Sequence, residues 1–285
     1  MSSPSNSDCF EDRTLYPYES DSSDDESSSD ERALDEGSLQ SNNSDYKVWH
    51  KPSSSKEQRI YQILGCHPRI LSALDNVSAK ETPVPLLENG DLRAFLLRKK
   101  DLPLATRLAW AIEIAEGIAY LHSHNIVWAN VHMGNMLLTD DYHVVLSDFT
   151  RSVLNPDLYQ EFKMLSSPIF ACPLYHYGIE PTHVDIFGFA VTLFALLDNR
   201  FPFTVDLSPT LMDEVHSLSK HERLELDQLQ DPILRKYFGP LLDDCFRVKI
   251  SRGSSLIRAL ADAHSKWFRE TNQEVNPTIM CAQID

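Results

Sequence analysis

The stretch that decides the fold is IVWANVHMGNMLLTDDYHVVLSDFT, residues 126–150. In its second half, two apolar runs rich in β-branched residues, NMLL and YHVVLS, flank the polar turn TDD, which predicts a β-hairpin. Polar side chains stand on both sides of this hairpin. Asn130 and Asn135 precede it, and Asp148 follows Asn135 by thirteen residues. The hairpin is therefore expected to bring these three side chains toward one place.

Helical patterns surround the hairpin. Residues 103–125 carry Pro103 at the expected first helical position and apolar residues at helical spacing. Residues 54–65 open on Ser and end on Gly65, which predicts a second helix, and residues 45–52 predict a strand before it. Further helices are predicted over 185–197, 209–228, 231–246 and 253–270. Mixed elements followed by a helical second half favour the α+β class.

Charge divides the chain. Residues 1–45 hold 13 acidic and 2 basic side chains, a net charge of −11, which leaves −5 of the total −16 for the other 240 residues. So acidic and Ser-rich a segment is predicted to be disordered. The folded domain is expected over 46–272, followed by a short tail, 273–285. Because no basic stripe could neutralise phosphates, nucleic acid is not an expected partner.

The sequence also bears on location. Its five cysteines form no C-x-x-C pair, so neither a metal site nor a disulfide framework is expected. The first residues lack the apolar core of a secretory signal, and the apolar run 187–197 is too short to cross a bilayer. We therefore expect an intracellular protein, cytoplasmic or nuclear.

The opening stretch resembles the active-site region of the eukaryotic protein kinase superfamily. There, a catalytic loop H-R-D-x-x-x-x-N is followed by a strand pair and D-F-G. The corresponding residues here are 128–130, Asn135 and 148–150. The resemblance covers roughly residues 47–270. It implies a two-lobed fold with a small lobe over 46–88 and a mainly helical large lobe over 89–272.

The resemblance also implies roles for single residues. Asn135 and Asp148 correspond to the ligands of the metal ions that hold the nucleotide phosphates. Glu57 corresponds to the helix glutamate that pairs with a strand lysine, and Leu87 lies where the chain reaches the nucleotide site before entering the large lobe. Asp185 corresponds to the aspartate that hydrogen-bonds the catalytic loop. ATP and Mg²⁺ are therefore possible ligands, bound weakly or not at all.

Several positions depart from the family pattern. The catalytic aspartate is Asn130, whose amide has no useful basicity, and His132 stands two positions later. Thr150 replaces the D-F-G glycine, and no glycine-rich phosphate loop precedes Glu57, so the small lobe is expected to be truncated. Either Lys47 or Lys51 could supply the strand lysine, and the sequence does not decide between them. The A-P-E element that braces the substrate segment cannot be placed.

Three interpretations follow. The first is a pseudokinase that binds a protein partner or nucleotide with weak or no phosphoryl transfer. The second is a divergent but active ATP-dependent Ser/Thr protein kinase, which fits Asn135 and Asp148. The third is a small-molecule phosphotransferase of the aminoglycoside or choline kinase type, because NVHMGN (130–135) resembles the D-x-H-x-G-N loop of that group. The sequence indicates neither an oligomeric state nor a particular substrate.

Overall fold

The computed structural model describes residues 47–74, 78, 80–99, 101–156, 172, 180–199 and 229–272. The acidic segment 1–45, the tail 273–285 and the helix predicted over 209–228 lie outside the described residues. Within them the structure is mixed, with three two-stranded sheets and mainly helical content. This composition agrees with the predicted α+β class.

The first part of the domain is a strand pair with one helix. Strand β1 (Val48–Pro52) runs antiparallel to β2 (Glu81–Pro85), and α1 (Ser55–Leu64) lies between them in the chain. The Ser54 side chain caps α1 by accepting from the Glu57 N–H, and Gly65 ends it at a positive φ of 55°. This cap sets which face of α1 turns inward, and Glu57 lies on that face.

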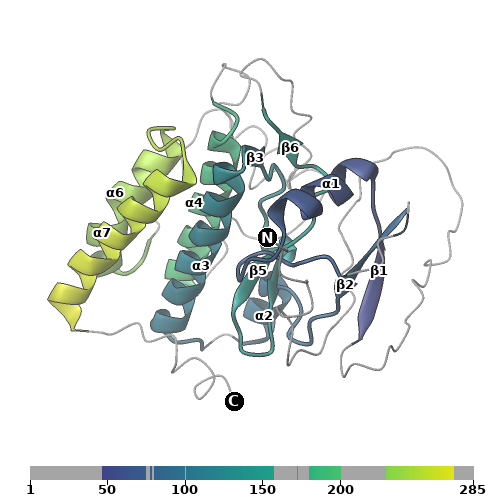
Figure 1. The fold of residues 1–285 in the computed structure, drawn as a ribbon. Helices are drawn as coiled ribbons and strands as arrows, with labels where there is room; N and C mark the ends of the chain where they lie inside the picture. The colour runs from purple at the N-terminus through teal and green to yellow at the C-terminus, as the bar shows by residue number, and fades with distance from the viewer. Residues whose placement is uncertain are drawn as a thin grey trace, which may run out of the picture.

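The second part is built of helices. Figure 1 shows α3 (Leu104–Ser123) and α4 (His183–Asp198) next to each other, with α6 (Pro232–Phe246) and α7 (Gly253–Thr271) beside them on the side away from β1 and β2. Helix α3 packs against α4, α7 and β5. The shorter α2 (Leu92–Arg98) contacts the loop region before β4. Helix α3 thus joins the helical layer to the strands.

The predicted hairpin lies between these two parts. Strand β4 (Met136–Leu138) pairs antiparallel with β5 (Val144–Leu146), and a short 3-10 turn, η2 (Met133–Asn135), leads into it. A second antiparallel pair, β3 (Ile126–Val127) with β6 (Val153–Leu154), joins the two ends of the segment that contains the hairpin. Residues 128–135 and 147–152 are consequently held side by side at one end of the hairpin.

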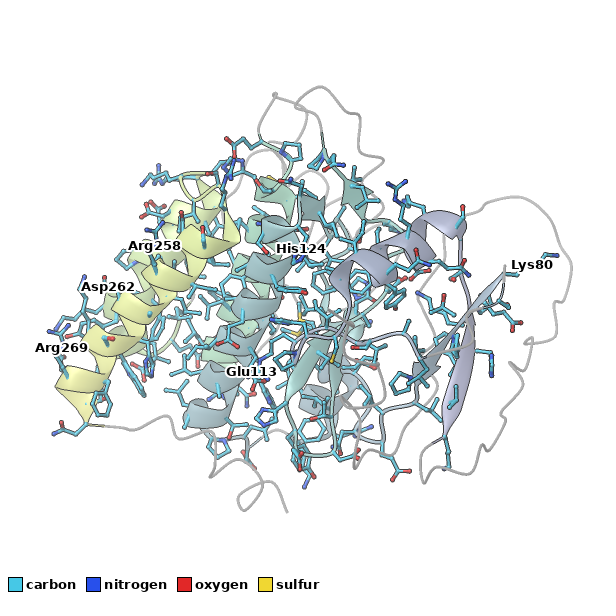
Figure 2. The ribbon with its side chains drawn as sticks, in the orientation of Figure 1. Lys80, Glu113, His124, Arg258, Asp262 and Arg269 are labelled. Atoms are coloured by element: carbon cyan, nitrogen blue, oxygen red, sulfur yellow. The ribbon has the colours of Figure 1, made fainter. Side chains whose placement is uncertain are left out.

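Hydrophobic patterning explains where each helix sits. Helix α4 is buried along nearly its whole length, as its continuous apolar sequence predicts. Helix α7 is amphipathic: Leu256, Leu260 and Trp267 are buried, whereas Arg258 and Asp262 are exposed on its outer face (Figure 2). The α7 surface is therefore ordinary solvated helix, and α4 is the core element against which the site is built.

Three predicted boundaries need correction. Pro103 is the residue before α3 and not its first helical residue. Helix α4 begins at His183, two residues earlier than predicted, so Asp185 stands inside the first turn and not at the N-cap. Strand β1 begins at Val48 and leaves Lys47 outside it. Each shift is small, and the last one separates the two candidate lysines.

The cysteines and the lengths of the helices both bear on the predicted location. Cys172 and Cys245 are free and buried. Within the described ranges no helix is both long and apolar enough to cross a bilayer. The intracellular location stays a prediction.

His67, in the turn after α1, gives this region a pH dependence. Its ring stacks on Tyr120 of α3 at 3.8 Å between ring centroids, and the Tyr120 hydroxyl donates to the Leu64 carbonyl at 2.6 Å. Partial burial, followed by the positive charge of Arg69, lowers the pKa of His67 below its ordinary value of 6.5. The neutral ring is therefore the form that the folded state favours.

We expect the free energy of unfolding to fall as the pH drops below about 6.5, because the unfolded chain then binds a proton that folded His67 resists. One such group gives a slope below about 1.4 kcal/mol per pH unit, reduced further because the ring is partly exposed. Urea unfolding at stepped pH values tests this. His67→Gln should flatten the acid side of the curve, and an unchanged slope would contradict the assignment.

Candidate functional site

The loop of residues 128–130 is hydrogen-bonded to the side chain of Asp185. This carboxylate is fully buried on α4 and accepts hydrogen bonds from the backbone N–H groups of Trp128 and Ala129, both at 2.8 Å. His122 of α3 contacts it at 2.9 Å from Nε2. Ala129 has a positive φ of 57°, which turns the chain so that both N–H groups face the same carboxylate. The loop is thus anchored to the buried helix α4.

A buried ion triad forms the centre of the site. The Lys51 Nζ of β1 lies 2.7 Å from the Glu57 Oε1 and 2.7 Å from the Asp148 Oδ1. All three side chains are buried, with Glu57 fully so. The Glu57 Oε1 also accepts from the Phe149 N–H at 3.1 Å. Strand β1, helix α1 and the segment after β5 therefore converge on one ammonium group.

The two asparagines complete the arrangement. The Asn130 amide donates from Nδ2 to the Asp148 Oδ2 at 2.8 Å, and the Asn135 Nδ2 donates to the Asn130 carbonyl at 3.0 Å. Asp148 also accepts from the Thr150 hydroxyl, Oγ1 to Oδ1, at 2.7 Å. Its backbone has a positive φ of 54°, whereas Thr150 is not among the positive-φ residues. Residues 130, 135 and 148, predicted from the sequence to converge, are thus linked by hydrogen bonds.

The two carboxyl groups of the triad differ in their electrostatics. Burial raises the pKa of Glu57 above its ordinary value, because this cost exceeds the attraction of Lys51. Burial alone would also raise the pKa of Asp148, but the charge and hydrogen bond of Lys51, together with the bonds from Thr150, bring it below its ordinary value. Asp148 is therefore the more firmly ionised of the two.

Aromatic side chains lie next to the triad in the sequence of α1 and of the segment that bears Asp148. The ring of Tyr61, one turn after Glu57 on α1, meets Phe149 edge to face at 5.2 Å between centroids. The buried Trp128 indole donates from Nε1 to the carbonyls of Ser147 at 3.0 Å and Asp148 at 3.2 Å. These contacts keep α1 close to the segment that bears Asp148, so Glu57 can reach Lys51.

A second buried carboxylate steadies the hairpin from behind. Glu113 of α3, labelled in Figure 2, lies 3.1 Å from the Arg69 Nη1 and 2.6 Å from the His143 Nδ1. It also accepts from the Val144 N–H at 2.8 Å. Glu113 therefore ties β5 and the turn after α1 to the central helix, and it plays no direct part in the triad.

The remaining predicted site residues lie elsewhere. The Lys47 side chain is largely exposed and contacts Glu88 at 3.8 Å, whereas Lys51 is the lysine that pairs with Glu57. Leu87 is buried two residues after the end of β2. His132 is half-buried and caps η2, its Nδ1 accepting from the Gly134 N–H at 3.1 Å. Neither Leu87 nor His132 contacts the triad through any described hydrogen bond.

Sequence reasoning missed two contributors. Tyr61 could have been found, since it follows Glu57 by four residues and must share its helix face. The hydroxyl contact of Thr150 could not, because it depends on the side-chain rotamer and on the unusual backbone angle of Asp148. Sequence showed that glycine is replaced at 150 but gave no sign of what the hydroxyl would bind.

Whether this site suits Mg²⁺ can be tested on its donors. A carboxylate and an amide supply the hard oxygen ligands that the ion prefers, so the residue types at 135 and 148 are suitable. The contacts that Asp148 makes are not. Both Asp148 oxygens already accept from the chain, and the Asn130 amide directs a hydrogen at Oδ2. In this arrangement the residues do not fit a bound metal. Among the described residues no group of three or more His, Cys, Asp or Glu side chains could hold one either.

Comparison with known proteins assigns the family. The family described as protein tyrosine and serine/threonine kinase matches residues 41–236, more than half of the chain. The chain belongs to the protein kinase family. Its mixed fold with small sheets and a mainly helical second part agrees with the two-lobed kinase architecture. The described part of the small lobe contains two strands and one helix.

Individual kinases show the same similarity at low identity. The chain is 28% identical over 160 residues to serine/threonine-protein kinase PLK4 of Drosophila virilis, which covers 53% of this chain and 20% of that protein. It is 28% identical over 151 residues to tyrosine-protein kinase receptor TYRO3 of Gallus gallus, a match that covers 46% of this chain and 17% of that protein. For serine/threonine-protein kinase 12 of Arabidopsis thaliana the identity is 29% over 151 residues, covering 48% and 32%. The matched part thus spans less than two thirds of each relative.

Proposed function

We propose that this kinase domain is a pseudokinase, which holds nucleotide weakly, transfers phosphate poorly or not at all, and acts by binding a protein partner. One observation carries the proposal: the residue at the catalytic base position is an amide, and it donates a hydrogen bond to Asp148. Members of the family in general use ATP and Mg²⁺, and their base is a carboxylate that accepts the proton of the substrate hydroxyl. A neutral amide has no useful basicity near pH 7, so Asn130 cannot take up that proton.

The size of this loss can be judged from general-base catalysis, which contributes roughly 10²- to 10⁴-fold in rate. Positioning of the phosphate by Lys51 would remain. Removal of the base thus leaves a slow enzyme or none, and the buried triad keeps residues 51, 57 and 148 together. That combination supports a role in binding more than a role in turnover.

A second candidate, an active and divergent protein kinase, is favoured by the Lys51 contacts. The ammonium lies 2.7 Å from both Glu57 and Asp148, which is the pairing expected of a lysine able to reach nucleotide phosphates. The family assignment favours either protein-directed interpretation over the small-molecule phosphotransferase. The transferred group would come from ATP and the acceptor would be a protein hydroxyl.

Nucleotide titration with a phosphotransfer assay separates the two. We expect ATP to raise the melting temperature modestly, following RT ln(1 + [L]/Kd), while labelled phosphate does not transfer to casein or to the chain itself. Asn130→Asp restores a carboxylate at the base position. It should raise transfer if the rest of the site is competent, by up to about 10²-fold.

Asp148→Ala is the control for both measurements, because any genuine transfer must disappear with it. Rapid transfer by the wild-type chain that is lost in Asp148→Ala would contradict the pseudokinase proposal and favour the second candidate. If no nucleotide raised the melting temperature, the nucleotide-binding part of the proposal would be wrong. Binding of a protein partner would then be the only proposed function left.

A further inference from the structure

The carboxylate of Asp148 is nearly filled by donors from its own chain. Lys51 and the Thr150 hydroxyl each reach Oδ1 at 2.7 Å, and the Thr150 N–H approaches the same atom at 3.4 Å. The Asn130 amide reaches Oδ2 at 2.8 Å. An ionised carboxylate offers about four acceptor positions, and three of these are taken by close contacts. The residue is only 7% exposed, so water does not compete freely for the remainder.

Two of these donors come from the departures of this sequence from the kinase pattern. A carboxylate at position 130 would repel Asp148 and call for a cation between them, whereas the amide attracts it directly. A glycine at position 150 would offer no hydroxyl. Asn130 and Thr150 therefore each replace an interaction that a cation would otherwise make with Asp148.

The geometry makes a cation a poor substitute for these donors. Mg²⁺ demands a near-octahedral shell of oxygen atoms and gives up its water reluctantly. At Oδ2 the hydrogen of the Asn130 amide carries positive charge toward the place a cation would occupy. At Oδ1 two close donors are already present. To bind both oxygens of Asp148, a metal ion would have to displace hydrogen bonds inside a largely buried cluster, where leaving a donor unpaired is costly.

We propose that Asn130 and Thr150 withhold Asp148 from divalent metal, so that divalent cations do not strengthen nucleotide binding by this domain. The nucleotide part of this inference rests on the proposed function, and the metal part does not. Asn130 and Thr150 are thus positioning residues that act through Asp148. Lys51 is the cation that the described cluster offers to a phosphate.

The first experiment needs no nucleotide. Mn²⁺ is titrated into the full chain and its binding is followed by electron paramagnetic resonance, with Asp148→Asn as the matched control. The control subtracts binding by the 13 acidic side chains of residues 1–45. We expect wild type and Asp148→Asn to bind Mn²⁺ alike. Asn130→Asp combined with Thr150→Gly should add a Mn²⁺ site that binds at least about tenfold tighter than the wild-type chain does.

Wild-type Mn²⁺ binding that is lost in Asp148→Asn would overturn the proposal. So would a double variant that gains no site, because the two side chains would then not be what keeps the metal out. Circular dichroism of each variant establishes that it is folded before its titration is interpreted.

The second experiment uses a non-hydrolysable ATP analogue with excess Mg²⁺ or with EDTA. We expect the two dissociation constants of the wild type to agree within about twofold. Thr150→Val removes the hydroxyl while keeping the branched shape, and it should shift the ratio in favour of Mg²⁺. Thr150→Ser keeps the hydroxyl and should restore the wild-type ratio, which a merely structural role would not predict.

An analogue that binds the wild type about tenfold tighter with Mg²⁺ would overturn the inference. Absence of analogue binding under both conditions would instead count against the proposed nucleotide holding. The Mn²⁺ titration would then still decide whether Asp148 is withheld from metal.

Discussion

Lys51→Met is expected to cost the domain about 3–5 kcal/mol of unfolding free energy near neutral pH, because it leaves two buried carboxyl groups without their shared cation. Glu57 and Asp148 each lie 2.7 Å from this ammonium, and neither is exposed enough for water to replace it. Methionine fills much the same volume, so the loss is electrostatic and not a cavity effect. Urea unfolding followed by circular dichroism measures it.

The same variant has a pH signature. In Lys51→Met the carboxyl groups bind protons more readily, so the destabilisation relative to wild type should shrink as the pH falls toward 5. Lys47→Met is the matched control, since its side chain is largely exposed and its contact with Glu88 is long. That control should change stability by less than about 0.5 kcal/mol. A loss of less than about 1 kcal/mol in Lys51→Met would mean that the triad is not formed.

Asp185→Ala is expected to cost about 3–5 kcal/mol, because three donors lose their shared acceptor inside the core. Two of them are the backbone N–H groups of Trp128, which is buried, and Ala129, which is half-buried. The residues that follow should loosen, so hydrogen exchange over 128–135 ought to accelerate together with the fall in stability.

Two further variants sharpen this result. Asp185→Asn keeps one acceptor oxygen but replaces the other with an NH₂ group, which cannot accept from the loop. The free energy of unfolding of Asp185→Asn should therefore lie between those of wild type and Asp185→Ala. Asp262→Ala removes an exposed carboxylate of α7 that pairs with Lys266 on the surface, and it should change stability by less than about 0.5 kcal/mol. Equal losses for Asp185→Ala and Asp262→Ala would contradict the anchoring role of Asp185.

The elements most accurately predicted from sequence are those with strong local patterns. The hairpin around TDD and the helices α3, α4, α6 and α7 appear within a few residues of their predicted positions, whereas α2 was not predicted. Boundaries were harder. Pro103 suits either the first helical position or the one before it, and backbone conformation alone chooses between them.

The choice between Lys47 and Lys51 shows why part of the site could not be predicted from the sequence. The two residues are four apart, so in an extended strand they point to the same face and periodicity cannot separate them. What separates them is where the strand begins and how far it stands from Glu57, which is a matter of tertiary packing. Similarly, the spacing of 130, 135 and 148 predicted convergence. The hydrogen bond from Asn130 to Asp148 depends on a rotamer that no spacing encodes.

The His122 ring is shared between two distant parts of the chain. Its Nε2 faces Asp185, and its Nδ1 accepts from the Gly253 N–H, the first residue of α7, at 3.0 Å. A Cβ at Gly253 would stand 2.4 Å from the Ala119 Cα, so only glycine lets the two backbones approach this closely. The C-terminal helix is thereby a brace for the loop that carries Asn130. Any shortened version made for crystallography or partner screening should retain residues 253–271.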